Sequence, residues 1–175
     1  MKREYPWYEV VESDELTQGD LLLGLPVPTP VTDLTFPLPE DDLVVDLLEF
    51  DVVVMTQSCD LAHDKITHVI LCPHWDLRKA QEMDPALAKK GAPKEIIQGR
   101  RPRYLMLDQS SDNDLEFPHR IVDFGRIFSL PKDYVRQYAA TLGKRLRLCP
   151  PYREHLAQAF ARFFMRVGLP QDIRL

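Results

Sequence analysis

Short apolar runs separated by turn residues dominate the first part of the chain and predict β-structure. The runs at 19–24, 43–50 and 51–57 are rich in Leu and Val, which is typical of buried strands. The run at 67–72 is expected to be the next strand. The nine residues 58–66 before it are then expected to form a hairpin connection, somewhat longer than the average one.

A proline-rich stretch and a long insertion interrupt this pattern. Residues 25–42 contain five prolines, so we expect a loop or an extended edge there, because proline lacks a backbone N–H and fixes φ. Further strands are expected at 103–108 and 119–128, which makes five or six strands in all. Residues 73–102 are expected to be a partly helical insertion, interrupted by Pro85.

The hydrophobic period changes to that of a helix in the last third of the chain. We expect C-terminal helices over about 131–168, the first after Pro131 and the second after Pro150 and Pro151. In the second helix, apolar residues recur three and four positions apart and face a polar stripe. Gly168 is expected to end it.

The composition is typical of an ordinary folded protein. Its 175 residues suit one domain, and 45% of them are hydrophobic and 28% charged. No apolar run approaches the roughly 20 residues of a bilayer span, and no apolar signal region begins the chain. We therefore expect no association with a membrane and a cytoplasmic location. Three cysteines are too few and too odd for a disulfide framework, which indicates a reducing compartment.

Charge is distributed unevenly along the chain. Residues 1–60 hold 14 acidic and 2 basic side chains, whereas residues 61–175 hold 13 acidic and 20 basic ones. No Lys or Arg occurs from 4 to 64, so this stretch is a poor surface for phosphates. The partner that such an acidic surface predicts is a protein with a basic surface.

Two later segments are basic. They comprise Lys89, Lys90, Lys94, Arg100, Arg101 and Arg103 in one, and Lys144, Arg145, Arg147, Arg153, Arg162 and Arg166 in the other. Such clusters form nucleic-acid footprints in some proteins, but in an acidic chain they more often form a solvated face or pair with an acidic partner. The candidate binding residues are Arg100, Arg103, Arg162 and Arg166, and RNA is a second kind of partner for them.

Cysteine and histidine residues suggest two kinds of site chemistry. Four residues have the ligand types of a zinc site: Cys59, His63, Cys72 and His74. The expected hairpin would place the first two and the last two at opposite ends, so one ion could not bind all four. A smaller zinc site at the 58–68 turn, from Cys59, His63 and His68, is an alternative. Cys59 with His63 is also a candidate for a nucleophile and its base.

Motifs for nucleotide, zincin or calcium binding do not occur, and neither a cofactor nor a metal is expected. Four other features do follow one another in order. They are Gly19 and Asp20 at the start of a strand, a Val-rich strand at Val52–Thr56 that ends in a polar loop, a strand at Val69–Pro73 that runs into a proline, and a helix after Leu130 and Pro131. This order resembles that of the MazF/PemK family of bacterial toxins, over about 19–60, 66–73 and 119–142.

The resemblance implies a fold class and a domain organisation. It implies an α+β protein in one domain, 1–175, built on a small SH3-like antiparallel β-barrel. The barrel would comprise about 6–72 and 103–128. The partly helical insertion at 73–102 and the C-terminal helices at about 131–168 would be additions to it.

The resemblance also implies a candidate site. The toxins cut single-stranded RNA with an arginine in the loop after the first strand and a hydroxyl residue just beyond the Val-rich strand. The second position falls on Ser58 or Cys59, with Asp60 beside them. The first position holds no Arg or Lys, so the guanidinium that would stabilise charge on phosphorus is missing. A nuclease would need a basic residue from the insertion or its edge, of which Arg101 is the candidate, beside Arg100 and Arg103.

A second likeness, in the Gln-x-Cys-Asp-Leu segment at Gln57–Leu61, is to a set of uncharacterised bacterial proteins, and no activity follows from it. The favoured hypothesis is therefore a non-catalytic macromolecule-binding or accessory protein of a bacterial stress-response or defence system, similar to toxin–antitoxin systems. The alternative is an endoribonuclease toxin that cleaves single-stranded RNA with a relocated basic residue.

Overall fold

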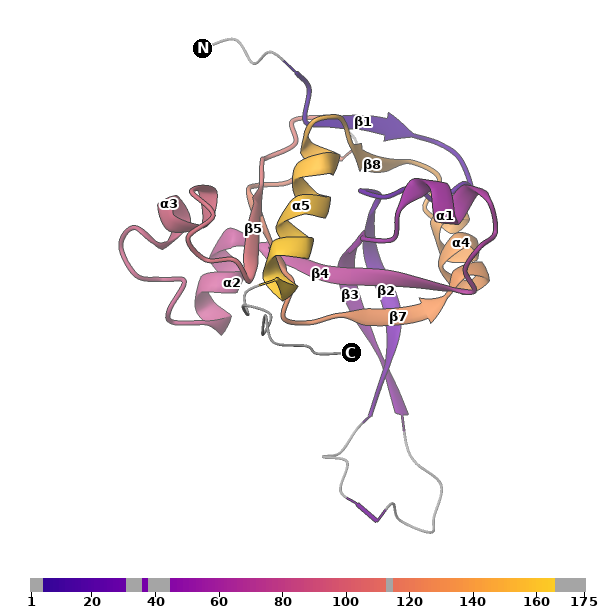
Figure 1. Ribbon diagram of the computed structural model, residues 1–175, viewed down its shortest axis with the longest axis horizontal. Helices are drawn as coiled ribbons and strands as arrows, with labels where there is room; N and C mark the ends of the chain where they lie inside the picture. Colours follow the sequence, from indigo (N-terminus) through magenta and orange to yellow (C-terminus); the bar gives the residue numbers. More distant parts are fainter. Residues whose placement is uncertain (1–4, 31–35, 38–44, 113–114, 166–175) are drawn as a thin grey trace, which may run out of the picture.

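The computed structural model describes residues 5–30, 36–37, 45–112 and 115–165, which form an α+β fold (Figure 1). The strands are β1 (Tyr8–Val11), β2 (Leu21–Pro30), β3 (Val45–Val54), β4 (His68–Asp76), β5 (Tyr104–Leu107), β6 (Arg120–Asp123), β7 (Phe128–Pro131) and β8 (Arg145–Leu148). The helices are α1 (Ser58–Ala62), α2 (Leu77–Met83), α3 (Ala92–Ile97), α4 (Lys132–Thr141) and α5 (Tyr152–Phe164).

The main sheet is open rather than closed into a barrel. Its strand order is β2-β3-β4-β6-β5, with β7 beside β4, while β1 and β8 form a separate pair. All pairs are antiparallel. Strand β4 is long enough to pair with β7 and β3 in its first part and with β6 in its last part. The closed SH3-like barrel implied by the resemblance is therefore not what the described residues form, because β2 and β5 remain separate edges of one sheet.

Several elements differ from those that the sequence predicts. The segments 43–50 and 51–57 belong to one strand, β3, and the expected connection 58–66 contains the helix α1. The expected loop at 25–42 begins as the second half of β2, which is the extended-edge alternative. A turn at Gly125 divides the strand expected at 119–128 into β6 and β7.

The C-terminal region contains both expected helices and one unexpected strand. Helices α4 and α5 follow Pro131 and Pro151. Between them lies β8, which pairs with β1 near the N-terminus. Arg166 and the expected end of the second helix lie outside the described residues.

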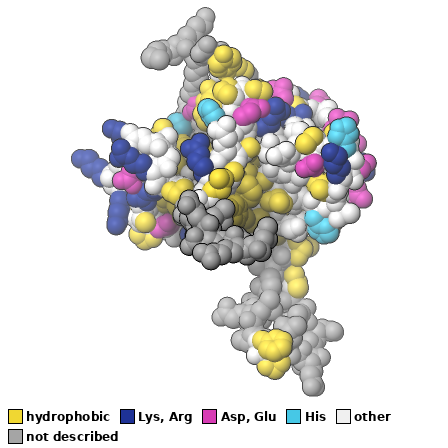
Figure 2. Space-filling view, viewed as in Figure 1, with side chains coloured by type: hydrophobic (Ala, Val, Ile, Leu, Met, Phe, Trp, Pro, Cys, Tyr) yellow, Lys and Arg dark blue, Asp and Glu magenta, His cyan; other side chains and the backbone are white. Residues whose placement is uncertain are grey.

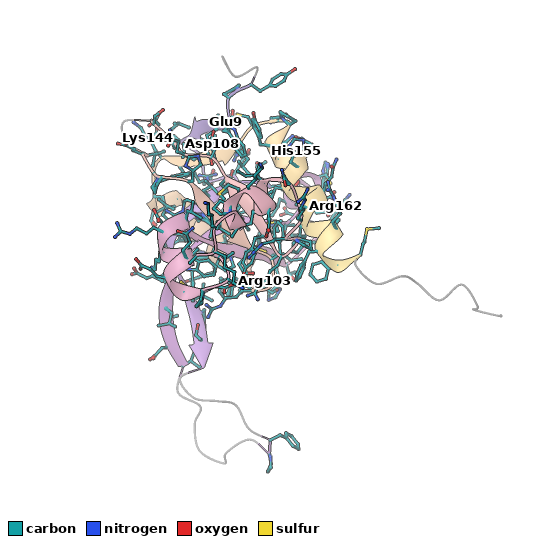
Figure 3. The ribbon with its side chains drawn as sticks, turned by 90° about the vertical axis from the view of Figure 1, so that its left-hand side faces the viewer. Glu9, Arg103, Asp108, Lys144, His155 and Arg162 are labelled. Carbon is teal, nitrogen blue, oxygen red and sulfur yellow. The ribbon has the colours of Figure 1, made fainter. Side chains whose placement is uncertain are left out.

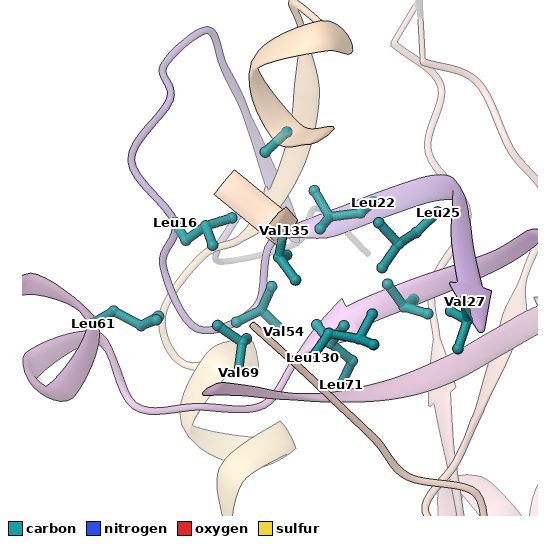
Figure 4. Close-up of a cluster of buried hydrophobic side chains, with 12 residues drawn as sticks. Leu16, Leu22, Leu25, Val27, Val54, Leu61, Val69, Leu71, Leu130 and Val135 are labelled. Carbon is teal, nitrogen blue, oxygen red and sulfur yellow. The ribbon is translucent and has the colours of Figure 1, made fainter. Parts of the chain in front are cut away.

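Two hydrophobic cores lie on opposite faces of β3. Val52 and Val54 pack under α4 with side chains from β2, β4 and β7 (Figure 4). Val53 points to the other core, with residues of β5, β6, β8 and α5. Because successive strand residues alternate between faces, a run of valines is the composition of a strand that is buried on both sides.

The Gly19–Asp20 pair fastens β8 to the start of β2. Gly19 has φ +87°, and a Cβ there would lie 3.0 Å from Cβ of Leu148, so both the backbone conformation and the close approach require glycine. Asp20 is fully buried and forms ion pairs with Arg145 and Arg147. Two members of the second basic cluster therefore form internal pairs rather than a solvated face.

Candidate functional site

The sequence-predicted catalytic residues begin α1, directly beyond the Val-rich strand. Ser58 Oγ accepts a hydrogen bond from the backbone N–H of Gln18 at 3.3 Å. Cys59 is exposed, and its Sγ lies 3.7 Å from Oε1 of Gln57 and 3.8 Å from Oδ1 of Asp60. These sulfur contacts are with oxygen acceptors, and neither places a cation beside the thiol.

A cavity of about 320 Å³ lies beside Ser58, between the 15–17 loop, α1 and the start of α4. Lys132 and Arg136 of α4 also line it. Lys132 Nζ forms an ion pair with Asp64, and Arg136 Nη2 lies 3.6 Å from Oδ1 of Asp133. The cations that line this cavity together with Ser58 therefore come from α4. Cys59 does not line this cavity.

Sequence reasoning missed Lys132 and Arg136 because the link is non-local. Strand β7 pairs with the start of β4, and the N–H of Lys132 donates to the carbonyl of Thr67 at 2.8 Å. This pairing brings the first turn of α4 beside α1. The available signal was the polar stripe at the start of the helix after Pro131, which becomes informative only once the β4–β7 pairing is known.

Arg101, the candidate replacement cation, is placed elsewhere. Its Nε donates to Oε2 of Glu95 at 2.7 Å and its Nη1 donates to the carbonyl of Ala86 at 2.8 Å. Figure 1 shows α3 and α1 at opposite sides of the molecule. The structure thus does not bring Arg101 together with Ser58, and Arg101 instead ties α3 to the loop that follows α2.

Arg103 is held in a fixed orientation at the rim of a second cavity. Its Nε and Nη2 donate to the two carboxylate oxygens of Asp123 at 2.7 and 2.8 Å, and this hydrogen bonding raises the pKa of Arg103. The N–H of Gly125 donates to Oδ1 of Asp123 at 2.8 Å. A Cβ at Gly125 would lie 2.6 Å from Nε of Arg103, so this arrangement requires glycine. The local geometry therefore fixes Arg103 through Asp123.

The cavity beside Arg103 has a volume of about 540 Å³ and lies between α2 and the β5–β6 hairpin. Its lining combines apolar side chains with Arg103, Arg126, Tyr104 and Asp84. The Tyr104 hydroxyl donates to Oδ2 of Asp84 at 3.0 Å, and burial together with this bond raises the pKa of Tyr104 to about 12. Tyr104 is consequently a neutral hydrogen-bond donor at physiological pH. The cavity lining holds two acidic side chains, Asp84 and Asp123, and two basic ones, Arg103 and Arg126.

A buried polar network lies where β2 and β3 leave the body of the sheet. Nδ1 of His74 accepts from Nε of Arg120 at 2.7 Å, and Arg120 also forms an ion pair with Asp51. Because Nδ1 is the acceptor, the proton of a neutral His74 resides on Nε2. Burial, followed by the charge of Arg120, holds the pKa of His74 well below its usual value, and a backbone interaction with Val52 acts in the opposite direction.

The zinc alternative has no convergent ligand set. Within residues 5–30, 36–37, 45–112 and 115–165, no three His, Cys, Asp or Glu side chains are grouped so that they could hold a metal ion. Cys72 and His74 are buried on β4, and burial, with a smaller effect of Asp123, raises the pKa of the Cys72 thiol to about 12. His68 contacts its neighbour Thr67 instead, with Nδ1 3.1 Å from the hydroxyl.

The β2–β3 ribbon, here called the arm, belongs to the stretch of the sequence without Lys or Arg. Figure 1 shows the two strands extending together beyond the rest of the sheet. On β3, Leu47 is 65% exposed and Leu48 44%, and the acidic residues Asp46 and Glu49 beside them are also exposed. The arm therefore presents apolar surface and negative charge together, without a Lys or Arg in either strand.

The two edges of the arm differ in their capacity to pair with another strand. Pro26 and Pro28 lie two positions apart on β2, so their nitrogens face the same side, and neither can donate a hydrogen bond. Strand β3 pairs with β4 only from Val52 onward. Within the described residues, the β3 edge from Val45 to Asp51 is thus open, whereas prolines interrupt β2.

Comparisons with known proteins add no relative: the sequence matches no protein-family model, and no curated protein matches it. The functional assignment therefore depends on the residues themselves. Among the helices in the described part of the chain, none is long and apolar enough to cross a membrane.

Proposed function

We propose that this protein is a non-catalytic binding protein that docks a basic protein partner on the arm, as an accessory subunit of a bacterial stress-response or defence system in the cytoplasm. The observation that carries the proposal is that each face of β3 here presents an exposed leucine beside an exposed carboxylate, Leu47 with Glu49 and Leu48 with Asp46. The MazF/PemK-like scaffold is part of the proposal. The consecutive antiparallel pairing of β2, β3 and β4 and the helix after Leu130 and Pro131 support it.

The physical argument combines two contributions. Leu47 and Leu48 are consecutive on β3 and point to opposite faces of the arm, so a partner on one face would cover one of them. That burial would contribute on the order of 1 kcal/mol, because each side chain is about half exposed. Carboxylates beside this apolar surface would steer a cationic partner and disfavour an anionic one. Nucleic acid is disfavoured on the arm for the same reason, since it would bring phosphates next to Asp46 and Glu49.

The proposal is tested with a fluorescein-labelled peptide of eight alternating Lys and Val residues, followed by fluorescence anisotropy. We expect binding that weakens as salt is added and that is reduced at least tenfold by Asp46→Lys with Glu49→Lys. The matched control, Glu82→Lys with Asp133→Lys, makes the same charge change at exposed positions on α2 and α4 and should stay within twofold of wild type. Equal losses in the two variants, or no binding at low salt, would contradict the proposal.

A second candidate function is endoribonuclease activity, and the cavity that joins Ser58 to Lys132 and Arg136 favours it. There Lys132 would supply the cation that the first loop lacks, once released from Asp64. A labelled mixed-sequence RNA is incubated with the protein in EDTA and analysed on a denaturing gel. The binding proposal expects no cutting. Cutting that is lost in Ser58→Ala and Lys132→Ala but retained in Cys59→Ala, whose side chain lies outside the cavity, would assign the nuclease instead.

A further inference from the structure

Strand β5 is an open edge that lies between two helical layers. In the strand order of the main sheet it comes last, and among the described strands it pairs with β6 alone. Ile96 of α3 packs on the face of the β5–β6 hairpin that carries Met106, and Leu156 of α5 belongs to the core on the face that carries Leu107. Figure 1 shows β5 running between α3 and α5.

A groove follows this edge. Two cavities, of about 290 and 320 Å³, adjoin each other because both are lined by Ile96 and Ile97 of α3, Leu105 of β5 and His155 of α5. Trp7 and Tyr152, which stack with ring centroids 3.8 Å apart, line the end near β1. The groove is therefore continuous along the edge strand and mostly apolar.

The backbone of β5 presents hydrogen-bonding groups to the groove. The carbonyl of Arg103 accepts from the N–H of Phe124 at 2.9 Å, so in this antiparallel pair the odd-numbered residues of β5 bond to β6. Tyr104 and Met106 then direct their backbone groups away from β6. The N–H of Tyr104 donates to the carbonyl of Arg101, which leaves the carbonyl of Tyr104 and both groups of Met106 for a strand in the groove.

One arginine lines the groove, and further basic side chains are exposed on the α3 segment. Arg162 lines it from α5, and Lys94 and Arg100 are exposed on and just after α3. Figure 3 shows Arg162 and His155 on α5, and Figure 2 shows a concentration of Lys and Arg over the α2–α3 end. The acidic residue in the lining, Asp108, lies 3.0 Å from Nε2 of His119, so its charge is partly engaged. The groove thus has a cation, Arg162, in its lining, whereas the strands of the arm hold no Lys or Arg.

We propose that this groove binds an extended, acidic segment of a partner protein by strand addition to β5. The segment pairs with the backbone of Tyr104 and Met106, places apolar side chains against Ile97 on the α3 side, and directs carboxylates toward Arg162 on the α5 side. Ile97 is 70% exposed, so such an occupant would bury apolar surface there. This site is separate from the arm and takes a partner of the opposite charge.

Peptide chemistry supplies a test that does not alter the fold of the protein. The probe is a fluorescein-labelled hexapeptide of alternating Glu and Val, measured by anisotropy at low salt. Methylation of every second amide nitrogen removes the donors on one edge of the peptide. We expect one of the two alternating methylation sets to lower affinity at least tenfold and the other to leave it within twofold, because strand addition uses a single edge. Equal effects of the two sets would overturn the proposal.

Charge variants locate the site and separate it from the arm. Arg162→Glu should weaken peptide binding at least tenfold, whereas Lys144→Glu, an exposed cation outside the groove lining, should leave it within twofold. Binding should also survive Asp46→Lys with Glu49→Lys, so failure of the arm proposal and failure of this one are distinguishable. The protein could instead bind an eight-nucleotide oligouridine and not the peptide, with the RNA binding lost in Arg162→Glu. That result would overturn the assignment in favour of RNA.

Discussion

The buried imidazole of His74 predicts a defined loss of stability as pH falls from 7 to 5. Its pKa is held well below the usual value of about 6.5 by burial first and by Arg120 second, so the folded state keeps it neutral while the unfolded chain takes up a proton. A folded-state pKa that is lowered stabilises the protein above the unfolded pKa, and this contribution is lost as pH falls through about 6.5. While the folded imidazole stays neutral, the loss between pH 7 and pH 5 is about 2 kcal/mol.

Urea unfolding at pH 7, 6 and 5 measures this loss, and the variant His74→Gln isolates it. Glutamine can accept from Nε of Arg120 but does not titrate, so its free energy of unfolding should fall by about 2 kcal/mol less than that of wild type over the same range. The variant is expected to be less stable at pH 7, because the buried site is disturbed, and only the difference in slope counts. Parallel curves for the two proteins would refute the reasoning.

Three further predictions concern side chains with well-defined surroundings. Asp20→Asn should lower the free energy of unfolding by about 3–5 kcal/mol in urea, since it leaves the fully buried Arg145 without its ion pair; a loss under about 1 kcal/mol would contradict this. Gly125→Ala should cost about 1–2 kcal/mol, because a Cβ displaces Arg103 from Asp123, and an unchanged unfolding midpoint would show that the half-exposed pair contributes little. In the native protein at pH 8, the exposed Cys59 should react first with iodoacetamide, detected by mass spectrometry, and Cys59→Ala should remove the fast-reacting thiol.

The hydrophobic period predicted the helices that bury a single apolar face. It failed for a strand whose pairing partner is distant in the sequence. The helices after Pro131 and Pro151 carry one apolar stripe each, so their spacing alone indicates them. Strand β8 was missed because its two arginines alternate with leucines, a pattern that predicts solvated cations. The side chain of Arg145 is nevertheless only 1% exposed. Its partner Asp20 lies 125 residues away in the sequence, and nothing local signals the pair.

For the same reason, the sequence does not show which charged side chains are available to a partner. A basic cluster in the sequence counts cations without showing which of them are already paired inside the molecule. The structure places Arg145 and Arg147 on Asp20, Arg101 on Glu95 and Arg103 on Asp123, each at hydrogen-bonding distance. A cation held in this way would lose its internal bond on meeting a partner, so its net contribution to binding is small. In the two proposals, the charges used for recognition adjoin open strand edges: the carboxylates of the arm beside β3 and Arg162 beside β5. Both edges also offer backbone groups, which gives each surface a means of binding that does not depend on charge alone.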